Sequence, residues 1–173
     1  MKFEEKLFAR HLGKNILLDS NLLLVFLSGA LGAKFFGRFK RVGDYKMEDY
    51  ELLVRFMKSF TVLFTTPHIL TEVSNLADSL TGSYKRDWDV NFAALVRSEK
   101  TRIGVREKWT SAAELSELPE FLPFGIADTA LTQLSSEALV VTEDYRLSGV
   151  LKSRGLPVLN FGDLRKLRLH GNQ

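Results

Sequence analysis

The sequence predicts an α/β fold in which helices cover both faces of one central parallel sheet. Short apolar or β-branched segments alternate along the chain with longer segments of helical spacing, a pattern typical of parallel strands joined by helices. The 173 residues are 45% hydrophobic, which suits one domain with a substantial core. Because no linker, internal repeat or low-complexity tract interrupts the chain, we expect a single domain over residues 1–173.

The first half of the chain combines a buried strand, a glycine-rich arm and a second strand. An apolar run ends at Asp19, and Ser20 is placed to cap the helix that follows. Pro67 suits the first turn of a later helix. The expected elements are a strand at 15–19, a helix at 20–27, a loop or loosely ordered arm at 28–43, a helix at 47–59, a strand at 61–64 and a helix from 67 to about 80.

The second half alternates more regularly. Pro123 and Gly125 indicate a loop before a helix, and Gly155 ends another helix. The run from Ala138 to Thr142 is the clearest strand in the chain. The expected elements are a break at 82–85, a helix at 87–100, a short strand at 105–109, a short helix at 111–118, a helix at 126–136, a strand at 138–142, a helix at 147–154 and a strand at 157–160.

Composition and charge narrow the chemistry. The formal charge of +3 and the pI near 9.2 permit a polyanionic partner without requiring one. With no cysteine, the chain has no disulfide, thiolate metal site or thiol nucleophile, and its three histidines form no spaced ligand pair. Any metal must therefore be held by oxygen ligands, which favours magnesium or manganese over zinc.

Other classes of protein find little support. No apolar run approaches the roughly 20 residues that a membrane-spanning helix needs, and the charged N-terminal residues do not resemble a secretory signal, so we expect a cytoplasmic protein. The glycine-rich loops that bind dinucleotides or nucleoside triphosphates are absent, as is the Gly-x-Ser-x-Gly pattern of serine hydrolases.

Four acidic residues stand where a ligand site of an open α/β sheet is expected. Asp19 ends the first strand, and Asp144 follows the strand that ends at Thr142. Glu72 and Asp128 lie near the starts of helices that follow loops. Because ligands bind beyond the carboxyl ends of the strands, we expect these four side chains to converge there.

Converging carboxylates repel one another, and a divalent cation relieves that repulsion. Two such ions about 4 Å apart can hold a phosphodiester, activate water and stabilise the leaving oxygen. The alternative interpretation is local, since acids near helix starts also complement the helix dipole and need no other role.

Four segments carry these acids in a recognisable order: Ile16-Leu-Leu-Asp19-Ser20-Asn21, Leu70-Thr-Glu72-Val-Ser-Asn75, Phe124-Gly-Ile-Ala-Asp128-Thr-Ala-Leu131 and Val141-Thr142-Glu143-Asp144-Tyr-Arg-Leu147. Together with the closing segment 154–161, they resemble the PIN-domain family over nearly the whole chain. In that family a strand ends in Asp-Ser/Thr-Asn, a Glu and then an Asp open two helices, and Thr-x-Asp precedes a last helix.

The resemblance implies a PIN-like fold and a magnesium- or manganese-dependent endoribonuclease, either an RNA-processing enzyme or a toxin paired with an antitoxin. It implies that the metal-binding, catalytic acids are Asp19, Glu72, Asp128 and Asp144, and that the supporting polar residues are Ser20, Asn21 and Thr142. Glu143 is an alternative to Asp144. The segment 28–60 is longer than in the smallest toxin members, which is a departure from the simple toxin pattern.

A basic and aromatic cluster lies in that longer segment. Its cations are Lys34, Arg38, Lys40 and Arg41, and its aromatic residues are Phe35, Phe36 and Phe39. The cluster can bind RNA by charge and stacking, or the rings can dock on the core while the cations are merely solvated. Trp88 and Trp109 are expected to be core or interface anchors rather than stacking platforms.

Two other functions remain open. The same fold can serve as a catalytically inert RNA- or protein-binding regulatory module, or as a different carboxylate–metal enzyme such as a phosphatase or DNA nuclease. The apolar helix at 47–60 can serve a homodimer or only the core.

Overall fold

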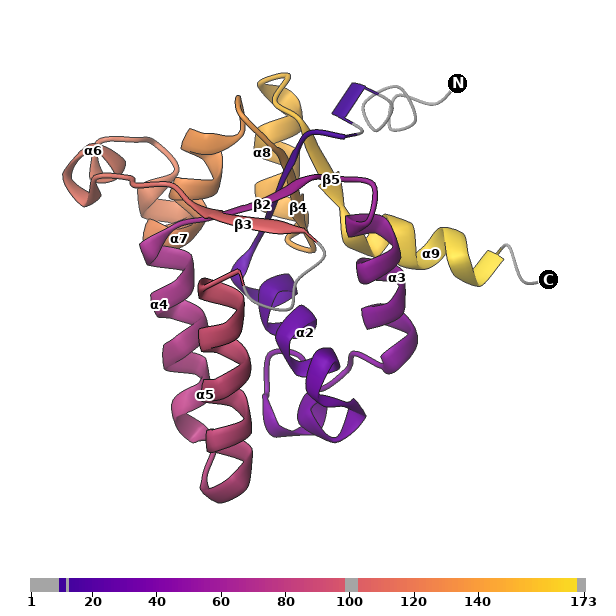
Figure 1. Ribbon diagram of the computed structural model, residues 1–173. Coiled ribbons are helices and arrows are strands. Elements are labelled where there is room, and N and C mark those ends of the chain that lie inside the picture. Colours follow the sequence, from indigo (N-terminus) through magenta and orange to yellow (C-terminus); the bar gives the residue numbers. More distant parts are fainter. Residues whose placement is uncertain (1–9, 12, 99–102, 171–173) are drawn as a thin grey trace.

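A computed structural model describes residues 10–11, 13–98 and 103–170, with side chains as far as residue 167. It contains one five-stranded sheet in the order β3-β2-β1-β4-β5, and every neighbouring pair of strands is parallel (Figure 1). The strands are β1 (Asn15–Leu18), β2 (Val62–Thr65), β3 (Gly104–Glu107), β4 (Leu139–Thr142) and β5 (Val158–Asn160). The predicted fold class, α/β with a central parallel sheet, is confirmed.

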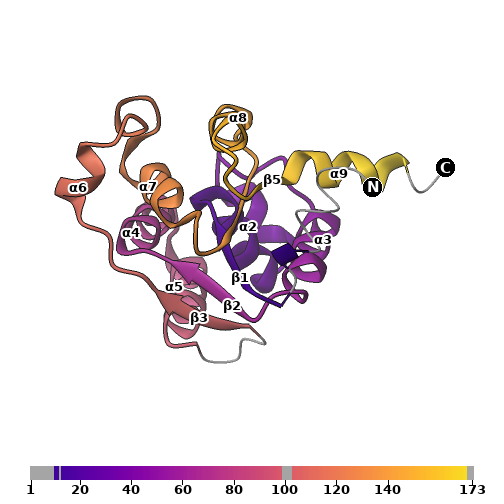
Figure 2. The same cartoon turned by 90° about the horizontal axis from the view of Figure 1, so that it is seen from above.

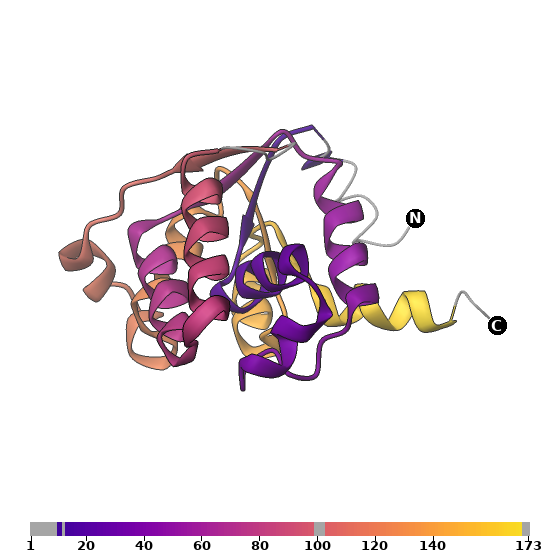
Figure 3. The same ribbon diagram turned by 60° about the horizontal axis from the view of Figure 1, so that its bottom comes forward.

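The helices are α2 (Ser20–Leu31), α3 (Met47–Met57), α4 (Pro67–Leu76), α5 (Gly82–Val96), α6 (Ala112–Ser116), α7 (Phe121–Leu134), α8 (Tyr145–Ser153) and α9 (Phe161–His170), with short 3-10 helices η1 (Ala33–Arg38) and η2 (Ala77–Ser79). Helices lie on both faces of the sheet, with α8 and α3 on opposite sides of the strands (Figure 2). In one layer α2 packs against α3, α4 and α5 (Figure 3).

The burial of the two central strands, β1 and β4, explains why the sequence predicts them clearly. The apolar residues of β1, from Ile16 to Leu18, and those of β4, from Leu139 to Val141, are all at most 1% exposed. Strands buried on both faces read as continuous apolar runs rather than as alternating ones. The predicted ends of both strands therefore lie within one residue of the observed ends.

The start of α2 corrects one expectation. The residue that caps this helix is Asp19, whose Oδ1 accepts a hydrogen bond from the backbone N–H of Leu22 at 2.7 Å. Ser20 is instead the first helical residue, and its hydroxyl is free to bond elsewhere. A residue predicted to bind a metal thus also caps the first turn of a helix.

The segment 28–43, expected to be a loop or loosely ordered arm, is helical in its first part and forms turns after residue 38. Its first residues extend α2 to Leu31 and the next form η1. One of its glycines, Gly29, lies within α2, where an added Cβ would lie 2.2 Å from Cγ of Tyr50 in α3. The glycine permits close packing of α2 on α3, and does not mark a loop.

Other boundaries also differ from expectation. The break expected at 82–85 is the start of α5, in which Lys85 pairs with Asp89 one turn later at 2.5 Å. That helix ends at Val96 rather than at residue 100, and residues 99–102 lie outside the described part of the chain. The loop expected before residue 126 is the first turn of α7, which breaks at Gly125 with a φ of 79°. Helix α9 had not been expected.

The tryptophans fall into opposite environments. Trp88 is 1% exposed and packs within the core, as expected, whereas Trp109 is 81% exposed and is no core residue. Among the described residues, no helix is both long and apolar enough to cross a membrane.

Replacing Gly29 by alanine is expected to lower the free energy of unfolding by about 1–3 kcal/mol, because the added methyl group overpacks the contact with Tyr50. The matched control is Gly149→Ala in α8, where nothing lies within 4 Å of the new Cβ and helix propensity favours alanine. Urea unfolding measures both. Equal stability of the two variants would contradict the packing role of Gly29.

Candidate functional site

Two of the predicted acids, Asp19 and Asp144, lie at the carboxyl edge of the sheet because the strands that precede them are neighbours. In the parallel pair of β1 and β4, Leu18 is aligned with Val141, and the N–H of Asp19 donates to the carbonyl of Val141 at 3.1 Å. Asp19 therefore stands where β1 ends. Asp144 is the N-cap of α8, two residues after β4 ends. Both positions agree with the sequence prediction.

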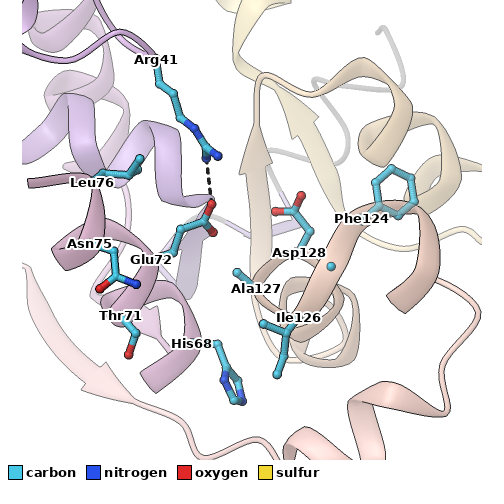
Figure 4. Close-up of a pocket in the computed structure, with 11 residues that line it drawn as sticks. Arg41, His68, Thr71, Glu72, Asn75, Leu76, Phe124, Ile126, Ala127 and Asp128 are labelled. Atoms are coloured by element: carbon cyan, nitrogen blue, oxygen red, sulfur yellow. Dashed lines mark hydrogen bonds and ion pairs between the residues drawn. The ribbon is translucent and has the colours of Figure 1, made fainter.

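The other two acids face a cleft between α4 and α7. Glu72 lies in the second turn of α4 rather than the first, and Asp128 lies in the first turn of α7 beyond the break at Gly125. A cleft of about 520 Å³ is lined by both acids, together with Arg41 and His68 (Figure 4). Figure 4 shows the carboxylates of Glu72 and Asp128 directed into the same space from opposite walls.

The charges of the other three acids affect the pKa of Asp128. Burial, and after it the charges of Asp19, Glu72 and Asp144, together raise the pKa of Asp128 to about 7, against a smaller opposing effect of Arg41. Carboxylates that are close and partly dehydrated disfavour one another's ionisation. The four acids predicted from sequence therefore form one electrostatic cluster around Asp128.

Asp19 is the most deeply buried acid of the cluster, at 5% exposed. Burial raises its pKa to about 6, whereas hydrogen bonds from the Thr142 hydroxyl and from the backbone of Leu22 and Glu143 oppose the shift. The Glu143 N–H donates to Asp19 Oδ2 at 3.2 Å. These hydrogen-bond donors favour the ionised form of Asp19. They also hold the carboxylate in one orientation, although burial removes water from it.

Both predicted supporting hydroxyls contact the acids. The Ser20 hydroxyl donates to Oε2 of Glu72 at 2.8 Å. The hydroxyl oxygen of Thr142 accepts the N–H of Asp144 at 3.0 Å, which holds the turn that carries this acid. Asn21 differs, because its side-chain oxygen is buried and has no hydrogen-bond partner among the described residues.

A positively charged side chain, that of Arg41, lies at the site. Its Nη1 lies 2.8 Å from Oε1 of Glu72, and both residues line the cleft (Figure 4). The guanidinium side chain is half exposed, which weakens the ion pair and leaves the arginine able to exchange partners.

The remaining cations of the basic segment lie outside that cleft lining. Lys34 and Arg38 stand over the ring of Tyr84, with Lys34 Nζ and the Arg38 guanidinium carbon 5.3 and 4.1 Å from its centroid, and Lys40 is exposed. The aromatic residues of the segment are buried: Phe35, Phe36 and Phe39. Of the two alternatives, docking of the rings on the core is the observed one, and these rings are not available for base stacking.

Beside the site lie Glu143, which had been considered as an alternative to Asp144, and three residues that had not been singled out: Tyr45, Asp49 and Arg165. Glu143 accepts hydrogen bonds from Tyr45 and from Arg165, and Arg165 also binds Asp49. Asp144, by contrast, directs Oδ1 at the backbone N–H groups of Arg146 and Leu147, at 2.7 and 3.1 Å. Arg165 lies in α9, which the sequence patterns had not indicated, so no signal pointed to it.

The donor chemistry of the cluster suits a hard divalent cation, because four carboxylates share one region and two of them have raised pKa values. As the side chains stand, no group of three or more histidine, cysteine, aspartate or glutamate residues in the described chain is arranged to hold an ion. Two of the acids have partners within the chain instead. Arg41 occupies Oε1 of Glu72, and the start of α8 occupies Oδ1 of Asp144.

No protein-family model matches the chain, and a search of curated proteins finds no match either.

The raised pKa of Asp128 makes stability depend on pH. An aspartate that titrates near 4 when unfolded and near 7 when folded binds more protons in the folded state between these values, so stability falls as pH rises from 4 to 7. Asp128→Asn is expected to remove part of this loss and to stabilise the metal-free protein by about 1–3 kcal/mol at pH 8, but much less at pH 4.5. Urea unfolding at both pH values, in the presence of EDTA, measures the effect. Equal stabilisation at the two pH values would contradict it.

Proposed function

We propose that the chain is a magnesium- or manganese-dependent endoribonuclease of the PIN-domain type. The observation that carries the proposal is that Asp128 faces Glu72 across one cleft and is influenced by the charges of three acids from separate parts of the chain, which add to burial in raising its pKa to about 7. A cluster of carboxylates that includes the buried Asp19 and the partly buried Asp128 costs stability, and binding of a divalent cation offsets that cost.

In this proposal Asp19, Glu72, Asp128 and Asp144 hold the metal. When bound, the metal supplies Lewis-acid activation of water and neutralises negative charge on the phosphodiester. Donors at Asp19 favour the ionised form of its carboxylate and orient it. Hydrolysis by in-line attack of water at phosphorus leaves 5′-phosphate and 3′-hydroxyl ends.

Arg41 has a second role in this proposal. Its guanidinium stands at the cleft beside Glu72, where it can bind a non-bridging oxygen of the substrate phosphate once a metal takes the carboxylate. Lys34, Arg38 and Lys40 would add contacts to the RNA backbone.

The second candidate is a catalytically inert RNA- or protein-binding regulatory module. The observation that favours it is the Arg41–Glu72 pair, which satisfies one acid without any metal. A phosphatase or DNA nuclease would use the same acids, and the choice among substrates rests on experiment. For the nuclease, a toxin role with an antitoxin partner, a homodimeric state and a cytoplasmic location are parts of the proposal.

Asp19→Asn and Asp128→Asn are each expected to reduce cleavage of a mixed RNA pool in Mg²⁺ or Mn²⁺ by at least about 100-fold, because a neutral amide binds a divalent cation poorly. Asparagine is also a good N-cap, so Asp19→Asn keeps the start of α2. The matched control is Asp87→Asn, on the exposed side of α5.

The same preparations are compared on RNA, single-stranded DNA, flap DNA and a small phosphomonoester, and product ends are identified. Metal-dependent loss of RNA in wild type and control, but not in the site variants, supports the nuclease. Salt-dependent RNA binding without cleavage would instead favour the inert module.

Arg41→Gln is expected to tighten Mn²⁺ binding several-fold while raising KM for RNA, because the variant frees Glu72 and loses a phosphate contact. Calorimetry with Mn²⁺ alone and steady-state cleavage measure the two effects separately. Weaker Mn²⁺ binding by the variant would contradict the proposed competition between arginine and metal.

A further inference from the structure

Both chain neighbours of Asp144 are held by α9. On one side, Glu143 Oε1 accepts a hydrogen bond from Nη1 of Arg165 at 2.7 Å. On the other side, the hydroxyl of Tyr145 bonds to Oδ1 of Asp163 at 3.2 Å and accepts from Lys166 at 2.9 Å. The acid of the site therefore lies between two residues that are fixed to one helix.

Arg165 is the central contact of this arrangement. Its Nε and Nη2 bind the two carboxylate oxygens of Asp49 in α3 at 3.2 and 3.3 Å, and its remaining nitrogen binds Glu143. The guanidinium also lies over the ring of Tyr45, 4.8 Å from the centroid, and the Tyr45 hydroxyl donates to Glu143. The planar guanidinium of Arg165 binds several partners at once and therefore holds them in one fixed geometry.

The start of α9 lies close to side chains of the segment 143–145. A Cβ built at Gly162 would lie 3.0 Å from the Tyr145 hydroxyl and 3.0 Å from Oδ1 of Asn160. The N–H of Gly162 donates to the same Asn160 oxygen at 2.9 Å. A side chain at position 162 would therefore press on the ends of the Tyr145 and Asn160 side chains where α9 meets the segment 143–145.

The same segment reaches a second acid. The backbone N–H of Glu143 donates to Oδ2 of Asp19, and the Asp144 carboxylate caps α8. A displacement of Glu143 would therefore move a donor away from Asp19 and shift the neighbouring Asp144 at the same time.

We propose that α9 positions the segment 143–145, with Arg165 as the main positioning residue and Tyr45 as its support, so that Asp144 and Asp19 are presented together to a divalent cation. This inference rests on the proposed metal-dependent function. It also assigns a role to Glu143, which supports the site through its backbone N–H and its anchored side chain rather than replacing Asp144 as a ligand.

A positioning role for Arg165 and a purely electrostatic role predict opposite changes in cation affinity when this residue is replaced. Arg165→Gln removes a positive charge near the acids, so electrostatics alone would tighten the binding of a cation. Loss of positioning weakens it, and residues that orient metal ligands typically contribute about tenfold or more to metal affinity. The sign of the change therefore separates the two effects.

The test measures Mn²⁺ affinity by calorimetry on the folded, full-length protein, and backbone hydrogen exchange of the segment 143–145 without metal. For Arg165→Gln we expect about tenfold weaker Mn²⁺ binding and faster exchange of the Glu143 N–H. Arg165→Lys, which keeps the charge but lacks the fork, is expected to weaken binding as well. The matched control is Arg86→Gln, an exposed arginine of α5, which is expected to change neither measurement.

Tyr45→Phe keeps the test decisive if Arg165→Gln does not fold, because it removes only one hydroxyl donor to Glu143 and no charge. Unchanged or tighter Mn²⁺ binding in every folded variant, with a wild type that binds Mn²⁺, overturns the positioning role and leaves the proposed function standing. A wild type that binds no Mn²⁺ overturns the proposed function and the positioning role with it. A fall in thermal stability with unchanged affinity and exchange would make Arg165 merely structural, which also overturns the inference.

Discussion

The parallel ladder between β1 and β4 aligns Leu18 with Val141, and this register sets the positions of the side chains at the carboxyl edge of the sheet. A slip by one residue would turn the apolar side chains of each strand to the opposite face and separate Asp19 from Thr142. The register is secure because both faces of these two strands are buried. The neighbouring helices α2 and α8 then begin where the strands end, and their N-caps are two of the four acids.

Placing carboxylates together, one of them buried and two partly buried, works against folding, so the surrounding structure must offset this cost. Asp19 and Asp144 offset part of it by accepting backbone hydrogen bonds at helix starts, where the helix dipole favours negative charge. Glu72 offsets its share through Ser20 and Arg41. Asp128 is the least compensated member, and it has the higher of the two raised pKa values.

Sequence patterns located the parts of this molecule that follow local rules. Asp19 and Asp144 were predicted at the sheet edge because each comes directly after an apolar run, and the helical spacing around Leu53 and Met57 identified α3. Parts that depend on tertiary contacts were missed. Gly29 looked like a loop residue because its partner, Tyr50, is distant in sequence.

The capping of α2 shows a subtler limit. Asp19 and Ser20 are both good N-cap residues, and only the fold reveals that Ser20 is turned to Glu72 in a different helix. The contacts of Arg165 were likewise invisible, because they join α9 to two segments more than 20 residues away. Long-range pairing of charges has no local sequence signature.

The contrast between the two tryptophans has an optical consequence. Trp88 is enclosed by the core, where it contacts the ring of Phe39, and its indole should emit at short wavelength until the fold opens. Trp109 is almost fully solvated and precedes Thr110, whose carbonyl contacts His68 in the cleft lining. Iodide quenching should therefore act on one indole alone, so that intrinsic fluorescence separates events near the cleft from unfolding of the core.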